Sequence, residues 1–401
     1  MKILVVNAGS TTLKYQLFNA DDFSVMAKGN CERIGDGGHV EHKLPSGVTF
    51  SQDIALNSHA DAADMVVKLL TDATYGCISN LSEIGAVGHR IVHGGHKLTE
   101  SCVADEFAMA ELENCRDIDP LHIPGAIMGI EACKQAVPGV PQVLVFDTAF
   151  HSTMPPEAYT YPIPAEYANK YHIRKYGFHG TSHRYVSSEM IKIMGGNAEG
   201  TKIVTCHLGG GSSIAAVKDG KVIDTSMGFT PLDGLVMSTR CGSIDPAAVL
   251  FLMDKENISP RDMDTILNRK SGLAGICGMG DCRDMSRAME AGDEQATIAY
   301  NTLCYQVKRY IGAYAAAMGG LDAIVFTAGI GENQTSLRED VTAGLEFLGV
   351  EFDTEANNAV TRPAPITCLS KPTSKVKVYL IPTNEELAIA QDTLEIALRQ
   401  A

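Results

Sequence analysis

The chain has 401 residues, and 33 basic against 48 acidic side chains give a formal net charge of −15. Nucleic acids and anionic membranes are bound through basic surface, so we expect neither of them as a partner. At about 150 residues per domain, the length predicts two to three domains. Hydrophobic residues make up 45% of the chain and charged residues 20%, which is typical of a globular fold and does not indicate disorder.

The cysteines and the hydropathy pattern indicate a cellular compartment. The 11 cysteines are scattered, and no two of them form a Cys-x-x-Cys pair, so we expect reduced thiols rather than a disulfide framework. The N-terminal apolar run 3–6 is far too short for a signal peptide, and no stretch reaches the ~18 apolar residues of a membrane helix. The sequence therefore predicts a cytoplasmic protein.

Residues 2–18 and 202–217 share one pattern: a buried strand, a turn of small polar residues and a return strand. The two segments begin 200 residues apart, which indicates an internal duplication; chance similarity between two ordinary hairpins is the alternative. Two similar halves predict two α/β domains with a ligand cleft between them.

Further elements follow in chain order. The prolines of 155–164 suggest a domain boundary or crossover. Asp219-Gly220 is typical of a tight hairpin turn. The apolar spacing predicts helices over 298–318 and 385–398, and the run 323–326 reads as a buried strand.

The turns of the two repeats, 7–12 and 207–213, are rich in glycine and in hydroxyl side chains. Glycine lets a backbone approach an anion closely, and successive N–H groups can hold phosphate oxygens. One such turn is weak evidence, whereas two of them, one in each half, favour a phosphate-binding site. The chain has neither a Walker motif nor a dinucleotide-binding glycine motif in a strand–helix context.

Two charged residues lie beside apolar strands. Arg90 lies within such a strand and needs an anionic partner there, which is either a ligand or a structural carboxylate. Its neighbours His89 and His93 are four residues apart, a spacing found in metal sites, but no carboxylate ligand lies at a matching spacing. We therefore favour hydrogen-bonded core histidines. Asp147 ends a second apolar strand, where a magnesium-linked carboxylate and a simple cap are about equally expected.

Three other residues lie in polar segments. His179 stands between glycines and can approach a ligand closely, although zinc is disfavoured because no glutamate separates it from His183. Arg240 lies in a loop of small residues, and such loops often carry function. Glu385 begins the last predicted helix, where an acidic residue is often only a favourable cap.

Together these segments resemble the acetate kinase family, in order and over nearly the whole chain. The motifs that carry the resemblance are Asn7-Ala8-Gly9-Ser10, His89-Arg90, Phe146-Asp147-Thr148-Ala149-Phe150-His151, Tyr176-Gly177-Phe178-His179-Gly180-Thr181-Ser182-His183, Met227-Gly228-Phe229-Thr230-Pro231-Leu232 and Thr383-Asn384-Glu385-Glu386-Leu387. The family has the fold of sugar kinases, actin and heat-shock ATPase chaperones. That resemblance implies two duplicated ribonuclease H-like α/β domains flanking a nucleotide cleft.

The resemblance also implies a domain division and an activity. The N-terminal domain would span 1–150 and be completed by a helix over 385–401, and the C-terminal domain, 151–384, would carry the nucleotide site. The activity would be the reversible phosphorylation of acetate by ATP with magnesium, manganese being an alternative metal. Family members are typically homodimers.

Residue roles follow from the same resemblance. Asn7 and Glu385 would hold the magnesium ion. The catalytic residues would be Arg90, Asp147, His179 and Arg240. Arg90 would also bind the substrate, together with Val92, Leu121, His122, Phe178 and Pro231. The nucleotide would be bound by Lys14, His207, Leu208, Gly209, Gly210, Gly211, Asp281, Cys282, Arg283, Gly329, Ile330, Gly331 and Asn333.

The chain also departs from the family pattern. Gly210 stands where an asparagine is usual, and Cys282 replaces a bulkier apolar residue of the adenosine site, so GTP and pyrophosphate stay open as phosphoryl donors beside ATP. The nearest alternative function is a propionate or butyrate kinase, against which the bulk of Val92 argues. A nucleotide-regulated binding protein of the same fold is a more distant alternative, because it needs no arginine pair beside a small apolar pocket.

Overall fold

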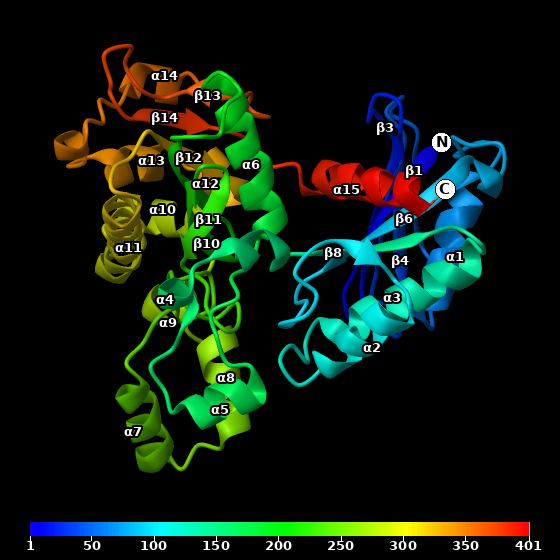
Figure 1. The fold of residues 1–401 in the computed structure, drawn as a ribbon, viewed down its shortest axis with the longest axis horizontal. Helices are drawn as coiled ribbons and strands as arrows, with labels where there is room; N and C mark the ends of the chain where they lie inside the picture. The colour runs from blue at the N-terminus through cyan, green and yellow to red at the C-terminus, as the bar shows by residue number, and fades with distance from the viewer. Residues whose placement is uncertain (401) are drawn as a thin grey trace. The chain divides into compact units, whose positions relative to one another are not determined.

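The computed structural model describes residues 1–400, and the chain divides into two compact units (Figure 1). Unit 1 consists of Met1–Phe150 and the C-terminal segment that begins at Asn384, and unit 2 of His151–Thr383. Among the described residues, no helix is both long enough and apolar enough to cross a membrane.

Unit 1 is built on an eight-stranded sheet with the order β5-β4-β3-β2-β1-β6-β8-β7. Its strands are β1 Lys2–Ala8, β2 Leu13–Asn19, β3 Val25–Glu32, β4 His39–Lys43, β5 Thr49–Asp53, β6 Ile84–Ile91, β7 Cys102–Val103 and β8 Gln142–Phe146. Its helices are α1 His59–Leu70, η1 Leu81–Glu83, α2 Glu106–Asn114, α3 Ile123–Ala136 and α15 Glu385–Gln400, and the short η2 Ala149–Thr153 follows β8.

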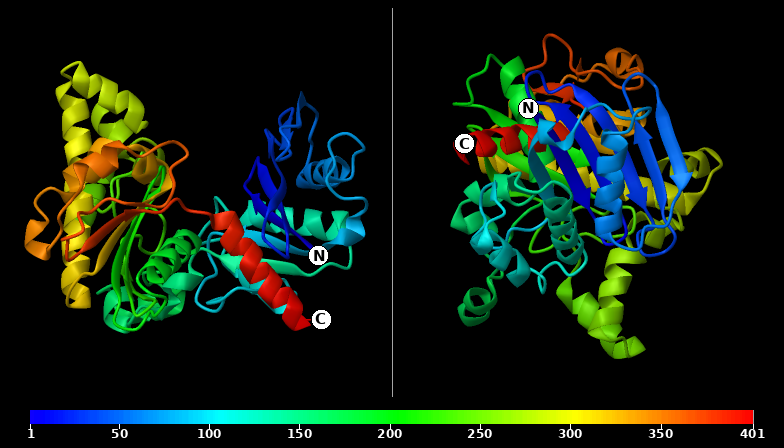
Figure 2. Two further views of the ribbon diagram at one scale, coloured as in Figure 1. Left: turned by 90° about the horizontal axis from the view of Figure 1, so that it is seen from above. Right: turned by 90° about the vertical axis from the view of Figure 1, so that its right-hand side faces the viewer.

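Helices cover both faces of the central strands of this sheet, and the alternation along β1 explains how. Ile3 and Val5 point to one face, where they form a core with Ile389 of α15. Leu4 and Val6 point to the other face, where they share a core with residues of α1 and α3. The right-hand view of Figure 2 shows α1 lying across the strands. A central strand that is buried on both faces reads as a continuous apolar run in sequence.

Unit 2 is built on a six-stranded sheet with the order β11-β10-β9-β12-β14-β13. Its strands are β9 Lys202–Leu208, β10 Ser212–Lys218, β11 Lys221–Thr225, β12 Ala323–Thr327, β13 Thr367–Cys368 and β14 Lys377–Leu380. Its helices are α4 Pro156–Tyr159, α5 Ala165–Tyr171, α6 Gly180–Ile193, α7 Pro246–Glu256, α8 Pro260–Arg269, α9 Gly272–Cys277, α10 Cys282–Glu290, α11 Glu294–Met318, α12 Ala328–Asn333, α13 Thr335–Thr342, η3 Glu346–Leu348 and α14 Thr354–Asn358.

The internal duplication is confirmed by the strand order. The core β3-β2-β1-β6-β8 of unit 1 and the core β11-β10-β9-β12-β14 of unit 2 have the same order. In unit 1, β1 pairs antiparallel with β2 and parallel with β6. In unit 2, β9 pairs in the same way with β10 and β12. The fold class, two duplicated α/β domains, is therefore the one expected from the sequence.

Each of the two sequence repeats, which begin at residues 2 and 202, ends with a helix that packs on the sheet of the other repeat. Helix α6 follows β8 along the chain but contacts β9 and β12 of unit 2. Helix α15 follows β14 but contacts β1, β6 and β8 of unit 1. Each sheet therefore receives one covering helix from the other half of the sequence (Figure 1).

Both predicted glycine turns are shorter than the sequence suggested. Strand β1 continues through Asn7, which pairs with Lys14, and β9 continues through His207 and Leu208, which pair with residues of β10. Only Gly209–Gly211 separate β9 from β10. Pairing with the neighbouring strand outweighs the weak strand preference of asparagine and places these side chains at strand ends.

Candidate functional sites in the two units

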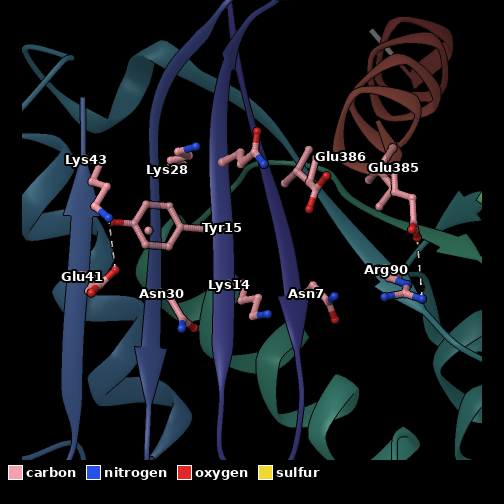
Figure 3. A pocket seen from close by; sticks show the side chains of 14 residues that line it. Asn7, Lys14, Tyr15, Lys28, Asn30, Glu41, Lys43, Arg90, Glu385 and Glu386 are labelled. Atoms are coloured by element: carbon pink, nitrogen blue, oxygen red, sulfur yellow. Dashed lines mark ion pairs between the residues drawn. The ribbon is translucent and has the colours of Figure 1, made fainter. Parts of the chain in front are cut away.

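Unit 1 contains a cavity of about 370 Å³ that brings together four of the predicted site residues, Asn7, Lys14, Arg90 and Glu385 (Figure 3). The cavity is formed by residues of strands β1 to β4, of β6 and of the first two turns of α15. Its full lining is Val5, Asn7, Lys14, Tyr15, Gln16, Lys28, Gly29, Asn30, Glu41, Lys43, Arg90, Glu385, Glu386 and Ile389. Lys14, predicted to bind nucleotide, lies here on β2 directly opposite Asn7.

Arg90 is held in place by Asp147. Strands β6 and β8 are parallel neighbours, so Arg90 near the end of β6 meets the residue that follows β8. Arg90 Nε donates to Asp147 Oδ1 at 3.1 Å and Nη2 donates to Oδ2 at 2.8 Å. The side chain of Asp147 is only 2% exposed, and its charge raises the pKa of Arg90. This bidentate pair fixes the guanidinium and leaves its other N–H groups for the cavity.

Glu385 brings a buried carboxylate oxygen without a hydrogen bond to the cavity. Its Oε2 atom is buried, accepts no hydrogen bond and lies 3.7 Å from Arg90 Nη2. Burial raises the pKa of Glu385 to about 7; Arg90 opposes this rise, and Asp147 and Glu386 add to it. Helix α15 is capped by Asn384, whose side chain accepts from Leu387 N at 3.1 Å, so Glu385 is not needed as the cap.

These side chains fit a magnesium ion that is bound together with substrate phosphates. Among residues 1–400, no three or more His, Cys, Asp or Glu side chains are gathered as a metal cage. Magnesium does not need such a cage, because it is usually held by one or two carboxylates, waters and phosphate oxygens. The unfilled Oε2 of Glu385, with the amide of Asn7 in the same cavity, is a donor set of this kind.

In unit 2, His179 and Arg240 meet at the glycine turn. A Cβ atom placed on Gly211 would lie 3.3 Å from His179 Nε2 and 3.5 Å from Arg240 Nη1. Arg240 Nη1 also donates to the carbonyl oxygen of Pro231 at 3.1 Å. Ser238, between the turn and Arg240, bonds through its backbone N–H to the carbonyl oxygen of Gly210. Two of the predicted catalytic residues thus lie next to the turn of their own unit that was predicted to bind phosphate.

A second cavity, of about 530 Å³, opens beside this turn and contains most of the predicted nucleotide residues. Its lining is Gly209, Gly210, Ser238, Gly280, Asp281, Cys282, Arg283, Gly329, Ile330, Asn333, Gln334 and Arg362. Asp281 caps α10 and pairs with Arg283, whose hydrogen bonds lower the pKa of Asp281 to about 2. Burial raises the pKa of the Cys282 thiol to about 11, so this thiol stays neutral.

Several predicted residues do not line either cavity. His207, Leu208, Gly211 and Gly331 are absent from the second cavity, and the side chain of Leu208 lies in the core. Apart from Arg90, none of the residues predicted to bind the substrate lines either cavity. Of these, Val92, Leu121 and His122 belong to unit 1, and Phe178 and Pro231 to unit 2. Leu121 is 50% exposed, whereas Phe178 is 1% exposed.

Sequence reasoning missed a polar patch in unit 1 and several residues in unit 2. Lys28, Asn30 and Lys43 line the first cavity because they alternate along β3 and β4, a signal that requires recognising those two strands. Arg362, in the second cavity, donates to the carbonyl oxygen of Asn333 at 2.7 Å. Arg338 is fully buried beside it and holds the carbonyl oxygens of Gly331 and Glu332 at 2.9 and 3.0 Å.

Comparisons with known proteins agree with the resemblance. The model of the Acetokinase family matches residues 2–391. The acetate kinase of Methanosarcina barkeri (strain Fusaro / DSM 804) is 51% identical over 403 residues, covering 100% of this chain and 98% of the relative. The acetate kinase of Thermoanaerobacterium thermosaccharolyticum is 53% identical over 398 residues, covering 99% of each.

Two solved structures are similar over nearly the whole chain. The acetate kinase of Porphyromonas gingivalis matches with a TM-score of 0.94 and 43% identity, over 98% of this chain and 99% of that one. A propionate kinase of Francisella tularensis subsp. tularensis matches with a TM-score of 0.90 and 38% identity, over the same shares.

Proposed function

Since the chain belongs to the acetokinase family, we propose that it transfers the γ-phosphoryl group of ATP reversibly to acetate, giving acetyl phosphate and ADP. The observation that carries this proposal is the cavity of unit 1, where Arg90, held by a buried carboxylate, lies beside the underbonded Glu385. A fixed guanidinium suits a carboxylate or phosphate ligand, and a buried carboxylate suits a cation.

In the proposed reaction the main difficulty is charge. Acetate is already a nucleophile at neutral pH, so the reaction needs no general base. The carboxylate must approach an anionic phosphoryl group, and such transfers are catalysed mainly by positioning and by positive charge around the equatorial oxygens. We assign Arg90 in unit 1, and His179 and Arg240 in unit 2, to that charge. Asp147 keeps Arg90 in its orientation.

We assign the metal to Asn7 and Glu385 and the nucleotide to unit 2. Magnesium supplies charge neutralisation on the phosphate oxygens when it is bound; manganese is the alternative ion. The backbone of Gly209–Gly211 would hold nucleotide phosphates, and the cavity at Asp281 and Asn333 would take the nucleoside. Val92, Leu121, His122, Phe178 and Pro231 are assigned to the acetate, as the resemblance implies.

Propionate is the second candidate acceptor, because a propionate kinase matches this chain with a TM-score of 0.90. One methylene changes binding by only ~1–3 kcal/mol in an apolar pocket. A preference between the two acids is therefore modest, and the bulk of Val92 favours acetate.

The test is a matrix of acids against phosphoryl donors. Acetate, propionate and butyrate are each combined with ATP, GTP or pyrophosphate, and acyl phosphate is trapped with hydroxylamine and quantified. We expect the highest kcat/KM for acetate with ATP. A higher kcat/KM for propionate would move the assignment to the second candidate, and no acyl hydroxamate with any combination would reject the kinase proposal.

We also propose a homodimer in the cytoplasm. Helix α7 is eleven residues long and has no buried residue. Its large apolar residues Leu250 and Phe251 are 67% and 60% exposed. An apolar surface of this kind is typical of an interface between proteins. All eleven cysteines are free, as expected of a reducing compartment. Sedimentation of the protein and of a Leu250→Asp, Phe251→Asp variant should give a dimer and a monomer, respectively.

A further inference from the structure

The proposed catalytic His179 is one end of a chain of buried side chains in unit 2. Ser213 Oγ lies 2.9 Å from His179 Nδ1 and 2.8 Å from His183 Nε2, so one hydroxyl bridges two imidazoles. His183 Nδ1 lies 2.7 Å from Thr205 Oγ1. Thr205, His183 and Ser213 are all fully buried, and none of them contacts the second cavity.

The direction of these hydrogen bonds follows from the requirement that a buried hydroxyl must place its proton. Thr205 Oγ1 has one hydrogen-bond partner, His183 Nδ1, so Thr205 donates to that nitrogen. Burial, with His151 and His207 nearby, lowers the pKa of His183 well below its usual value, so His183 is neutral. A neutral imidazole that accepts at Nδ1 carries its proton on Nε2, and His183 therefore donates to Ser213.

The same logic reaches His179. Ser213 Oγ accepts from His183 Nε2, so its own proton goes to its other partner, His179 Nδ1. Accepting at Nδ1 leaves the Nε2 atom of His179 as the N–H donor. That Nε2 atom is the one that faces Gly211 alongside Arg240. The ring itself is fixed by stacking on His207, with centroids 4.1 Å apart.

We propose that Ser213 is a positioning residue, which together with His183 and Thr205 holds His179 as the Nε2–H tautomer and aims that donor at the transferring phosphoryl group. Ser213 is fully buried and lines neither cavity, so it would act through His179. The role of the donor rests on the proposed kinase function, whereas the tautomer does not. At many metal sites, the tautomer of a histidine ligand is fixed in the same way, by the hydrogen bond at the ring nitrogen that does not bind the metal.

The first experiment compares Ser213→Ala with Ser187→Ala. Ser187 is also a buried serine of unit 2, but its hydroxyl donates to the carbonyl oxygen of Arg184 within α6. We expect Ser213→Ala to lower kcat by roughly 10–100-fold, the range found for outer residues that orient a histidine ligand. KM for acid and nucleotide should change much less, and Ser187→Ala should keep its kcat. An unchanged kcat in Ser213→Ala overturns the proposal.

The second experiment reads the tautomer directly and does not depend on activity. Selectively ¹⁵N-labelled histidine is recorded by NMR in the wild-type protein, with a His179→Gln variant to assign the signal. We expect His179 with its proton on Nε2 in the wild type, and a loss of this preference in Ser213→Ala but not in Ser187→Ala. A wild-type His179 protonated on Nδ1 alone overturns the proposal, even if the protein proves to be a kinase.

Discussion

Units 1 and 2 share a five-strand core but present different chemistry at the same strand ends. In unit 1, charged side chains line the cavity: Arg90, bound by Asp147, and the underbonded Glu385. In unit 2, the turn after the corresponding strand is Gly209–Gly211. It contributes two glycines to a cavity that Asp281, Arg283 and Arg362 also line. We propose that one scaffold supports recognition by side chains in one copy and by the backbone of the glycine turn in the other, because function depends on the loops and strand ends rather than on the sheet.

The largest expected effect is in unit 1. Arg90→Ala should lower turnover by roughly 10³-fold or more, by analogy with other arginines that stabilise phosphoryl transfer. Steady-state assays measure it, with Arg33→Ala as the control, since Arg33 pairs with Asp53 on the surface. A melt by circular dichroism shows whether the unpaired Asp147 has unfolded the variant. A folded Arg90→Ala variant with turnover within tenfold of the wild type would remove the contrast between the units.

The next effect concerns the metal. Glu385→Gln keeps the shape of the side chain but loses its charge, so the magnesium concentration at half-maximal rate should rise. Mutation of a residue that orients a metal ligand lowers metal affinity by about 10–100-fold. For a direct ligand we therefore expect the required magnesium concentration to rise at least about 100-fold. Glu395→Gln, an exposed position on the same helix, is the control. An unchanged magnesium titration would show that unit 1 does not hold the ion.

The third prediction is a pH dependence of stability. Burial lowers the pKa of His89 in unit 1 to about 4, below the ~6.5 of an unfolded chain. The unfolded state therefore binds more protons between these values, and stability is lost as pH falls from about 6.5 towards 4. Between pH 7.5 and pH 5, the wild type should lose about 2 kcal/mol of unfolding free energy through His89. The His89→Gln variant, whose glutamine can still hydrogen-bond Gln142, should not show this loss. Denaturant melts at both pH values measure this.

Unit 2 has its own buried His183, whose pKa is also lowered by burial, so His89→Gln should flatten only part of the acid dependence. An identical loss of stability with falling pH in wild type and variant would mean that His89 does not contribute.

The smallest expected effect is in the backbone site of unit 2. A Cβ on Gly210 would have Ser238 Oγ at 4.0 Å as its nearest neighbour, so Gly210→Ala should fold normally. The added methyl group enters the space assigned to phosphates, and we expect KM for nucleotide to rise by less than about tenfold, or 1.4 kcal/mol. Acetate KM should not change. Gly312→Ala, on α11 with open space around it, is the control, and an equal effect from both would contradict the backbone role.

The sequence predicted the parts of the fold that depend on local pattern. The strands beside Asn7 and His207 were visible because buried central strands are continuous apolar runs. The Asp219-Gly220 turn was also confirmed, with both residues at positive φ. The lengths of the glycine turns were wrong, because a strand end is decided by pairing across the sheet and not by the residues alone.

Other features depend on contacts that the sequence does not reveal. Arg90 was expected to bind either a ligand or a structural carboxylate, and its pairing with Asp147 became visible only when β6 and β8 were placed side by side. Arg338 gave no signal, because no motif marks an arginine whose partners are two backbone carbonyl oxygens and the side chain of Asn357. Lys28 and Lys43 face each other across β3 and β4, a register that sequence alone does not fix.

The exchange of the last helices has a consequence for synthesis on the ribosome. Residues 1–150 leave the exit tunnel before unit 2, but the face of their sheet that carries Ile3 and Val5 forms its core with α15, which is made after unit 2. The same helix delivers Glu385. During translation this apolar face therefore lacks α15 until unit 2 has been made, and a chain that stops before residue 385 lacks both this helix and Glu385.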